Sequence, residues 1–425
     1  MSCSSPIKMM ISLAMLLVGC NPIPGNAQLV QSDLPRLESP AVSAGQEAQL
    51  VDGNNSFAFG MYHVINQEKI DNLIFSPYSI WLAFSMIYAG AQGETETQMA
   101  RGFHFLDQES QHLTLNAIDQ RLQAIGMVEE AGEEGTPFQL GLANAVWSQQ
   151  GYAFNQAYLD LLATQYGAGL HTVDFRTSAE VAREAINAWV NEATDGRIEE
   201  IATPETVSSD TLIVLTNAIN FVAGWEYRFD QSKTIDGPFT LLDGGQVIVT
   251  QMHARNRLDF LEQHDFQAVQ LPYVNHAMEM WIILPAQGLF ELMQDQLDSE
   301  LMNEIRHSSE AKQVTLTLPR FDFGSELPLG ELLPQMGLVD AFCPTLDLGG
   351  IVEGGGLCID QALHRAVITV DEEGTEAAAA TIAAVPVSEV EEVEMTVNRP
   401  YIFVILARET GLILFLGQVL NPAIH

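Results

Sequence analysis

The sequence has few basic residues. Lys and Arg together number 18 among 425 residues, against 55 Asp and Glu, so the formal net charge is −37. A chain with this charge repels the phosphate backbone of DNA and RNA, and nucleic acid is not expected as a partner. The excess of carboxylates instead favours solubility in a saline or extracellular setting.

Cysteine is also scarce. The four cysteines are Cys3, Cys20, Cys343 and Cys358, and none lies in a CxxC or Cys/His pattern with the spacing of metal ligands. The histidines are scattered in the same way. No metal site, no cofactor and no disulfide framework is therefore predicted. Cys343 and Cys358 either form a disulfide outside the cytosol or remain as two buried thiols.

The signatures of common enzymes are absent as well. The chain contains no GxSxG, HExxH or Walker loop, and no GxGxxG between a strand and a helix. Ser309 and Lys312 match the SxxK spacing of some serine hydrolases, but Ser5 and Lys8 match it too, inside the N-terminal leader. A solvated helix end is the simpler interpretation of Ser309. The glycine-rich residues 349–356 lack a lysine and predict a surface loop, so the protein is not expected to be an enzyme.

No apolar run near the N-terminus is long enough to span a bilayer as a helix. Residues 1–19 instead have the pattern of a secretion signal, in which Lys8 precedes a short apolar run. Residues 17–20, Leu-Val-Gly-Cys, resemble a bacterial lipobox, which implies cleavage before Cys20 and a lipid on its thiol. The protein is then extracytoplasmic and anchored to the cell membrane or outer membrane without spanning it. An ordinary cleaved signal, which implies a secreted protein, is the alternative.

The rest of the chain divides into a short linker and one large domain. Residues 20–50 are rich in Pro, Ser, Gln and Gly without an apolar period, which predicts a flexible tether. Residues 51–425 show no internal repeat, and 47% of the whole chain is apolar, enough to bury a large core.

Helix and strand patterns alternate irregularly along this domain. Ser76 followed by Pro77 predicts the start of a helix whose apolar face holds Ile80, Ala83, Phe84, Ile87 and Ala91. A second helical face holds Ala182, Ile186, Trp189, Val190 and Ala193, with Gly196 as its stop. Strands are predicted at residues 212–221, 314–318, 366–370, 402–407 and 413–419. Helices early and strands late indicate an α+β domain.

The most unusual segment lies between two of these predicted strands. Residues 370–385 read Val-Asp-Glu-Glu-Gly-Thr-Glu-Ala-Ala-Ala-Ala-Thr-Ile-Ala-Ala-Val, and Pro386 follows. In isolation an alanine-rich run predicts a surface helix or a linker. Between two strands, with Gly374 at its start, the same run of small residues suits a segment that is exposed in one state and inserted into a sheet in another.

This segment resembles the hinge and reactive-centre loop of the serpin family. The similarity extends over about residues 55–422 and includes further family motifs in family order. These motifs are residues 72–80 (NLIFSPYSI), 215–221 (LTNAINF) with Gly224-Trp225, 271–273 (LPY), 318–321 (LPRF), 398–401 (NRPY) and 415–422 (FLGQVLNP). Each motif alone is weak evidence, but their order and spacing together are specific.

The resemblance implies a fold, a mechanism and a partner. Serpins have a fold of three β-sheets with about eight to nine helices, and an exposed loop that spans about residues 371–397 in this chain. A serine protease cleaves the loop and forms an acyl-enzyme. The cleaved loop then inserts into the central sheet and traps the protease covalently. The chain is therefore expected to act as a monomeric suicide substrate whose partner is a serine protease.

The resemblance also assigns roles to residues. The hinge comprises Glu372, Glu373, Gly374, Thr375, Glu376, Ala377, Ala378, Ala379, Ala380 and Thr381. The positions called shutter and breach, where the sheet opens, correspond to Asn72, Ser76, Ser79, Asn217, His364 and Trp225, with Glu372 also at the breach. For His364 alone, a core histidine with satisfied hydrogen bonds is the ordinary interpretation. Val222 departs from the family, because a basic residue is often found at its position.

The sequence predicts the position of the reactive bond to within one residue. The family's usual spacing from Gly374 gives Ser388–Glu389, and a slightly longer loop gives Val387–Ser388. Since Ser and Val are small and uncharged, an elastase-like or subtilisin-like protease is favoured over a trypsin-like one. Glu389, Glu391 and Glu392 would suit a protease with a basic surface.

Two alternatives remain. The first is a non-inhibitory serpin that serves as a binding protein. Such serpins usually carry bulky, charged or proline residues in the hinge. Here the residues that would share one face of an inserted strand are all small, which favours an inhibitor: Thr375, Ala377, Ala379, Thr381 and Ala383. A lipid-tethered serine hydrolase rests on the SxxK match alone.

Overall fold

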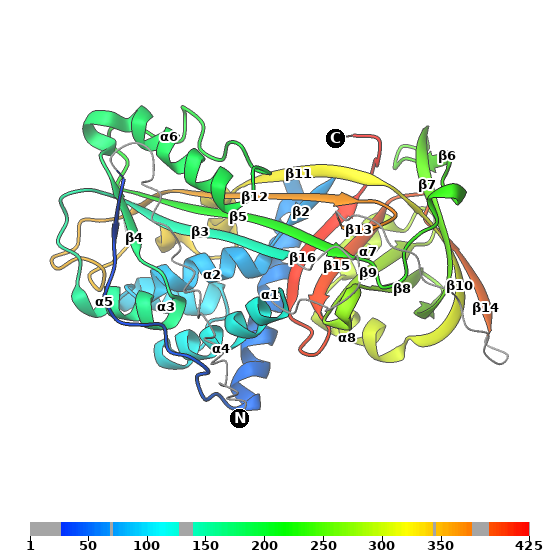
Figure 1. The fold of residues 1–425 in the computed structure, drawn as a ribbon, viewed down its shortest axis with the longest axis horizontal. Coiled ribbons are helices and arrows are strands. Elements are labelled where there is room, and N and C mark those ends of the chain that lie inside the picture. The colour runs from blue at the N-terminus through cyan, green and yellow to red at the C-terminus, as the bar shows by residue number, and fades with distance from the viewer. Residues whose placement is uncertain (1–26, 69–70, 127–138, 343–345, 376–390, 425) are drawn as a thin grey trace, which may run out of the picture.

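The computed structural model describes residues 27–68, 71–126, 139–342, 346–375 and 391–424. Two hydrogen-bonded sets of strands form the body, and helices cover them (Figure 1). The leader with Cys20, the hinge from Glu376 to Thr381 and both candidate reactive bonds lie outside the described residues.

The first sheet contains the strands that position the site. Its order is β1 (Gln28–Val30), β4 (Leu170–Val173), β3 (Gln139–Gln149), β5 (Ile213–Gly224), β12 (Ile359–Val370) and β11 (Phe321–Pro328). The central strands β5 and β12 are parallel and pair from Ile213 with Ile359 to Ile219 with Ala366. Beyond Ile219 the end of β5 pairs with the short strand β13 (Gly374–Thr375) instead.

The second set of strands runs in the order β14 (Glu392–Thr396), β10 (Glu310–Pro319), β7 (Gln246–Glu262), β8 (Phe266–Pro272), β9 (Met278–Pro285), β15 (Tyr401–Ala407), β16 (Ile413–Val419) and β2 (Leu73–Phe75), and β6 (Ile235–Thr240) pairs with β7. The long strand β7 joins two of the three expected sheets, because it pairs with β6 and β10 along most of its length and with β8 at its end.

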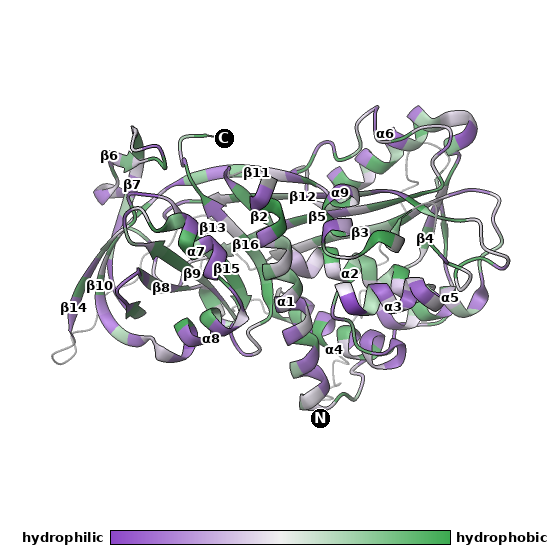
Figure 2. Ribbon diagram, turned by 180° about the vertical axis from the view of Figure 1, so that it is seen from behind, coloured by the Kyte–Doolittle hydropathy of each residue, from purple (hydrophilic) through white to green (hydrophobic). Residues whose placement is uncertain are grey.

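Nine α-helices occur in the described residues: α1 (Ala44–Glu68), α2 (Pro77–Tyr88), α3 (Gly93–Gly102), α4 (Gln108–Gly126), α5 (Gln156–Leu161), α6 (Phe175–Ala193), α7 (Phe290–Gln296), α8 (Ser299–Ser308) and α9 (Leu329–Gln335). In Figure 1, α6 covers one face of the first sheet and α2 to α5 lie on the other. In Figure 2, α3 is mostly hydrophilic, whereas α1 carries both hydrophilic and hydrophobic residues. None of these described helices has the length and apolar character needed to cross a bilayer. The predicted α+β architecture is confirmed.

Helix α2 begins as the sequence predicts, but it is more deeply buried. The Ser76 hydroxyl accepts the backbone N–H of Ser79 at 3.1 Å, and Pro77 occupies the first turn. Every residue of α2 is buried, and Ala91 lies beyond its end. A one-sided apolar face was predicted from the spacing, but the helix packs between the first sheet and α1, α4 and β16. Its remaining sides carry Tyr78, Trp81 and Tyr88, which are buried as well.

The other predicted elements are present, and most of them are longer than predicted. Helix α6 contains the predicted apolar face and begins at Phe175, and Gly196 has a positive φ of 80° after its end. All five predicted strands are found, as β5, β10, β12, β15 and β16. The division into early helices and late strands is wrong in detail, because β3 and β4 precede residue 212 and α7 to α9 follow it. The mixed small and polar residues of β3, QLGLANAVWSQ, gave no strand pattern.

The described part of the expected tether lies against the body. We call residues 27–43 the N-terminal strap. Its strand β1 pairs with β4, and the Arg36 guanidinium donates to Asn116 at 2.9 Å and to Asp119 at 2.7 Å on α4. The Leu37 carbonyl accepts side-chain amides from Asn116 and Gln120 of the same helix. Polar composition predicted flexibility here, but composition does not show that Arg36 and the Leu37 carbonyl have hydrogen-bond partners on a distant helix.

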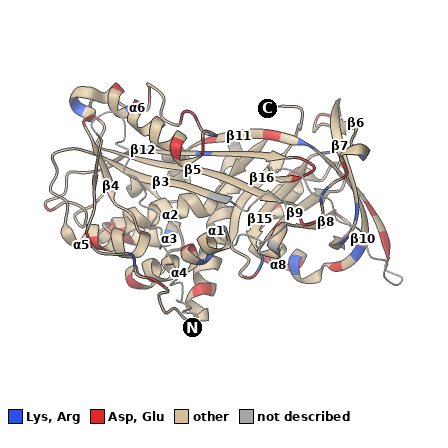
Figure 3. Cartoon of the chain, viewed as in Figure 1, with Lys and Arg blue, Asp and Glu red and all other residues tan. Residues whose placement is uncertain are grey.

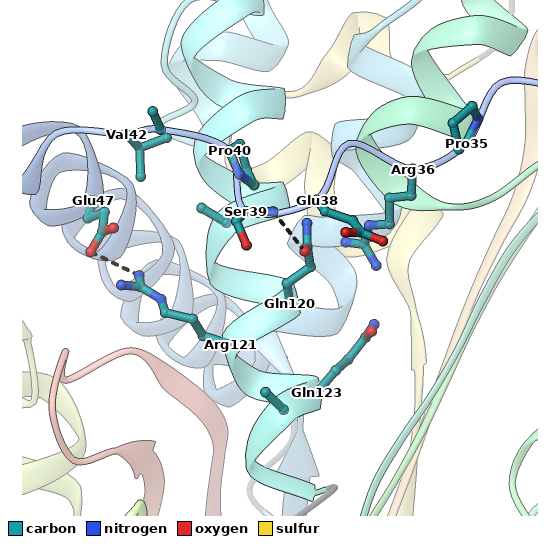
Figure 4. A pocket seen from close by; sticks show the side chains of 13 residues that line it. Pro35, Arg36, Glu38, Ser39, Pro40, Val42, Glu47, Gln120, Arg121 and Gln123 are labelled. Carbon is teal, nitrogen blue, oxygen red and sulfur yellow. Dashed lines mark hydrogen bonds and ion pairs between the residues drawn. The ribbon is translucent and has the colours of Figure 1, made fainter. Parts of the chain in front are cut away.

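A shallow pocket lies between the strap and α4 (Figure 4). Arg121 forms an ion pair with Glu47 across it at 2.9 Å, and Gln120 accepts the backbone N–H of Ser39 at 3.2 Å. Both basic residues of the lining already have acidic partners, Arg121 in Glu47 and Arg36 in Asp119, so the pocket shows no free positive charge for an anionic ligand.

Cys358, which directly precedes β12, is disulfide-bonded, and its partner lies outside the described residues. The interpretation of Cys358 as a free thiol is therefore wrong.

Candidate functional site

The candidate site lies along the boundary between β5 and β12, at the centre of the first sheet (Figure 1). These two strands are the ones that would part if a further strand entered between them. Two groups of polar residues lie on this boundary. One is halfway along β5, above α2, and the other is at the end of β5, beside β13.

His364 on β12 and Asn217 on β5 face each other in the sheet register. The backbone N–H of Ser76 donates to His364 Nε2 at 3.2 Å, so Nε2 is the unprotonated nitrogen and Nδ1 donates its hydrogen to Asn217 Oδ1. Burial lowers the pKa of His364 to about 3, which keeps the ring neutral at physiological pH. The two strands are thus joined by a side-chain hydrogen bond in addition to the backbone ladder.

The same hydrogen bonds continue onto α2 and β3. The Asn217 amide donates to Ser79 Oγ at 2.6 Å and to Asn144 Oδ1, and the Asn144 amide donates to the Ser79 carbonyl at 3.2 Å. We call Ser76, Ser79, Asn144, Asn217 and His364 the central polar network. Its side chains are buried or half-buried, so separation of β5 from β12 costs the hydrogen bonds of buried polar groups unless new partners arrive.

Asn144 and Asn72 differ from expectation. Asn144 faces Asn217 from β3 but was not predicted, because nothing in the sequence distinguishes it from an exposed strand asparagine.

Asn72, in contrast, was predicted as a shutter residue but is not part of the network. Its side chain accepts the backbone N–H groups of Leu420 and Asn421 at 2.8 and 3.0 Å, and it donates to the Asn421 carbonyl at 2.8 Å. It therefore fixes the chain after β16.

The second group surrounds Trp225 at the end of β5. The Trp225 backbone N–H donates to the Glu373 carbonyl at 2.9 Å, and its indole N–H donates to the Asp371 carbonyl at 3.0 Å. The carboxylate of Glu372, 1% exposed, forms an ion pair with Arg320 and accepts the Thr234 hydroxyl. Arg320 thus places a positive charge beside Glu372, a pairing that was not predicted from the sequence.

The hinge begins with a tight turn. Asp371 Oδ1 accepts the backbone N–H groups of Glu373 and Gly374 at 2.9 and 3.2 Å, and burial raises the pKa of Asp371. A Cβ at Gly374 would lie 2.2 Å from the Ala223 carbonyl oxygen, so only glycine permits this approach of the two strands. The turn therefore directs the chain back along β5.

Thr375, the residue after Gly374, is already part of the sheet. It pairs with Ala223 antiparallel to β5, and its side chain is fully buried. Its hydroxyl lies 2.8 Å from the hydroxyl of Tyr273. The first two residues of a potential inserted strand thus occupy the sheet before any cleavage.

The far end of the loop returns as β14, beside β10. Glu391 forms an ion pair with Lys312 at 3.1 Å, and Glu392 forms one with Arg255. Figure 3 shows acidic and basic residues close together at this edge of the molecule, around β10. Two of the three carboxylates that were expected to face a basic protease surface are therefore neutralised within the molecule, which weakens that expectation. The third, Glu389, lies outside the described residues.

The residues of the SxxK match do not form a catalytic pair. Ser309 lies after the end of α8 and donates to the Arg306 carbonyl at 3.3 Å, whereas Lys312 is on strand β10 and pairs with Glu391. The three-residue spacing therefore does not place them on one turn of a helix. In the part of the chain that the structure describes, no three His, Cys, Asp or Glu side chains are grouped to hold a metal.

Comparison with solved structures identifies the architecture. The native state of tengpin, a thermophilic serpin, superposes with a TM-score of 0.79 at 23% identity, over 93% of this chain and all of that one. Uncleaved ovalbumin gives a TM-score of 0.78 at 26% identity, over 88% of this chain and all of that one. These two comparisons show that the chain has the serpin fold.

The sequence comparison identifies the family. Residues 52–422 match the serpin (serine protease inhibitor) family, and the chain belongs to it. An uncharacterized serpin-like protein of Thermococcus kodakarensis is 36% identical over 95% of this chain and 92% of its own length. The leukocyte elastase inhibitor of Sus scrofa is 34% identical over 88% of this chain and all of its own length. Members of this family are generally inhibitors rather than catalysts.

Proposed function

We propose that this serpin inhibits serine proteases as a suicide substrate, by insertion of its cleaved loop into the first sheet. The observation that carries the proposal is the pairing of Gly374 and Thr375 with the end of β5. This pairing has the direction and the position of the first residues of an inserted strand. It therefore defines where the remainder of the loop would go.

The register of that insertion follows from the pairing. Thr375 faces Ala223, and each further loop residue faces one residue earlier on β5. Residues 376–378 would face residues 222–220, which β12 leaves unpaired, whereas Ala379 would face Ile219 and must displace β12. Thr381 would then lie opposite Asn217, at the central polar network. Insertion therefore begins in a gap and continues by separating β5 from β12.

The energy of this step is large enough to make it irreversible. Residues 376–385 would add on the order of ten backbone hydrogen bonds at roughly 1 kcal/mol each. A gain near 10 kcal/mol is comparable to the stability of a whole domain. The small side chains that alternate along the hinge avoid the overpacking strain of about 1–3 kcal/mol per site that bulky ones would cause.

Two observations support proteases with a shallow specificity pocket. Both candidate residues at the reactive bond, Ser388 and Val387, are small and uncharged. Relatives in Sus scrofa and Xenopus laevis carry the name leukocyte elastase inhibitor. We therefore propose elastase-like or subtilisin-like targets. A binding protein is the second candidate, since thyroxine-binding globulin shares the fold with a TM-score of 0.76, but the small hinge residues favour inhibition.

Incubation with elastase-like, subtilisin-like and trypsin-like proteases tests the proposal. The first two are expected to form covalent complexes that survive denaturant, and the trypsin-like protease serves as the control. The mass of the released C-terminal peptide assigns the bond, either Ser388–Glu389 or Val387–Ser388. Cleavage of the loop by every protease without any covalent complex would show that the protein is a substrate or a binder and not an inhibitor.

We also propose that Cys20 carries a lipid and that the protein is held on the outer side of a membrane. The lipobox-like residues 17–20 support this. Cells fed a labelled fatty acid are expected to label the wild-type protein, and Cys20→Ser is expected to remove the label and release the protein. Cys3→Ser, in the segment removed on processing, is the matched control and should retain the label. An unlabelled wild-type protein in the medium would instead show a plain secretion signal.

A further inference from the structure

Tyr273 lies directly after β8, and its ring is held on several sides. The ring is fully buried and stacks on the indole of Trp225, with centroids 4.6 Å apart and planes at 15°. Phe221 on β5 contacts it edge-on at 5.1 Å. The Tyr273 backbone N–H donates to the Met278 carbonyl at 3.1 Å. The body of the protein, and not the loop, therefore fixes the position of the Tyr273 hydroxyl.

That hydroxyl meets the hinge. Tyr273 OH and Thr375 Oγ1 are 2.8 Å apart, and both side chains are fully buried. Burial raises the pKa of Tyr273, so the phenol keeps its proton and can donate it. Among the hydrogen bonds of the described residues, neither hydroxyl has another partner. Each hydroxyl therefore depends on the other to avoid the cost of an unsatisfied buried polar group.

The hydroxyl pair also selects one register for the inserted strand. A shift of one residue would place Gly374 or the charged Glu376 opposite Ala223, and a shift of two would place Ala377 there. None of these residues carries a hydroxyl that could bond to Tyr273. Among positions 373–380, Thr375 is the only Ser, Thr or Tyr. The pair thus distinguishes the observed register from its neighbours.

We propose that Tyr273 is a positioning residue that holds Thr375 in the sheet before cleavage and fixes the register from which loop insertion proceeds. This inference rests on the proposed function and adds to it a residue of the body that acts on the hinge. Loss of the hydroxyl leaves the Thr375 hydroxyl buried without a partner, so the hinge leaves the sheet more often. Insertion then starts later, and more of the acyl-enzyme is hydrolysed before it is trapped.

A double-mutant cycle tests the contact without any protease. Tyr273→Phe and Thr375→Val each remove one hydroxyl with little change of shape. In hydrogen–deuterium exchange, each single variant is expected to increase exchange at residues 371–375 and 222–225 on the order of tenfold. The double variant is expected to return toward the wild-type rate, because neither remaining group needs a partner. Independent, additive effects, or wild-type exchange in Tyr273→Phe, would overturn the proposal.

Tyr401→Phe is the matched control. It removes another buried tyrosine hydroxyl, one that has no hydrogen-bond partner in the described structure, and it should leave hinge exchange unchanged. Equal effects of Tyr401→Phe and Tyr273→Phe would show a general loss of packing and would also overturn the proposal. Thermal unfolding of each variant confirms that the fold is retained.

The inhibition assay separates the two proposals. With an elastase-like protease, Tyr273→Phe is expected to raise the number of inhibitor molecules consumed per trapped protease severalfold. If the wild-type protein forms no covalent complex while the exchange cycle behaves as expected, the contact stands and the inhibitory function fails. If the wild-type protein forms complexes but hinge exchange does not respond to Tyr273→Phe, the function stands and the positioning role fails.

Discussion

Thr375→Arg is expected to convert the protein from an inhibitor into a substrate. The wild-type side chain is fully buried in the sheet, where it pairs with Ala223 and contacts Tyr273. An arginine there would bury a charge without a partner, which costs several kcal/mol, and would overfill the space. Insertion then becomes slower than hydrolysis of the acyl-enzyme. The yield of covalent complex should fall by about a hundredfold or more, while the loop is still cleaved.

Thr315→Arg is the control for this experiment. It makes the same substitution at an exposed position of β10, beside the far end of the loop, and it should leave the complex unchanged. Denaturing gels and the stoichiometry of inhibition measure both variants. Equal complex formation by Thr375→Arg and the wild-type protein would show that the hinge does not enter the sheet.

Cleavage of the loop between residues 384 and 389 by a protease that is not trapped is expected to stabilise the protein strongly. Insertion of residues 376–385 adds on the order of ten hydrogen bonds, roughly 10 kcal/mol in total. At about 1–2 °C per kcal/mol for a chain of this size, the melting temperature should rise by more than about 10 °C. Calorimetry before and after cleavage measures the change.

The Thr375→Arg variant is again informative in this measurement. Cleaved at the same bond, it should gain little stability, because its hinge cannot enter the sheet. An unchanged melting temperature of the cleaved wild-type protein would contradict insertion itself. An equal rise of the melting temperature in both proteins would mean that the stabilisation does not require Thr375 to enter the sheet.

Much of the candidate site could be predicted because its residues lie in local motifs. Ser76 lies at a predicted helix start and Asn217 in a predicted strand, but the roles of Ser76, Ser79, Asn217 and His364 follow from the resemblance to serpin motifs. The segment after Gly374 was recognised because small residues and one glycine suit a strand that enters a sheet. In each case a few neighbouring residues contained the signal.

The residues that were missed are defined by distant partners. Asn144, Arg320 and Tyr273 act through Asn217, Glu372 and Thr375, which are far from them in the sequence. Tyr273 and Arg320 lie in the LPY and LPRF motifs, but neither motif shows which distant residue its polar side chain contacts. The ordered contacts of the N-terminal strap were missed for the same reason, because Arg36 forms its ion pair with Asp119 on α4, far away in the sequence.

Strand β1 determines which end of the first sheet lies nearest to a group attached to the N-terminal part of the chain. Gln28 pairs with Thr172, which pairs with Ser148, and Ser148 pairs with Ile213 at the start of β5. The hinge pairs with residues 223 and 224 at the other end, about 35 Å away along the strand. In Figure 1 these ends lie at opposite sides of the sheet. A lipid, an affinity tag or a solid support joined directly ahead of Gln28 would therefore lie at the end of β5 opposite to the hinge residues Gly374 and Thr375.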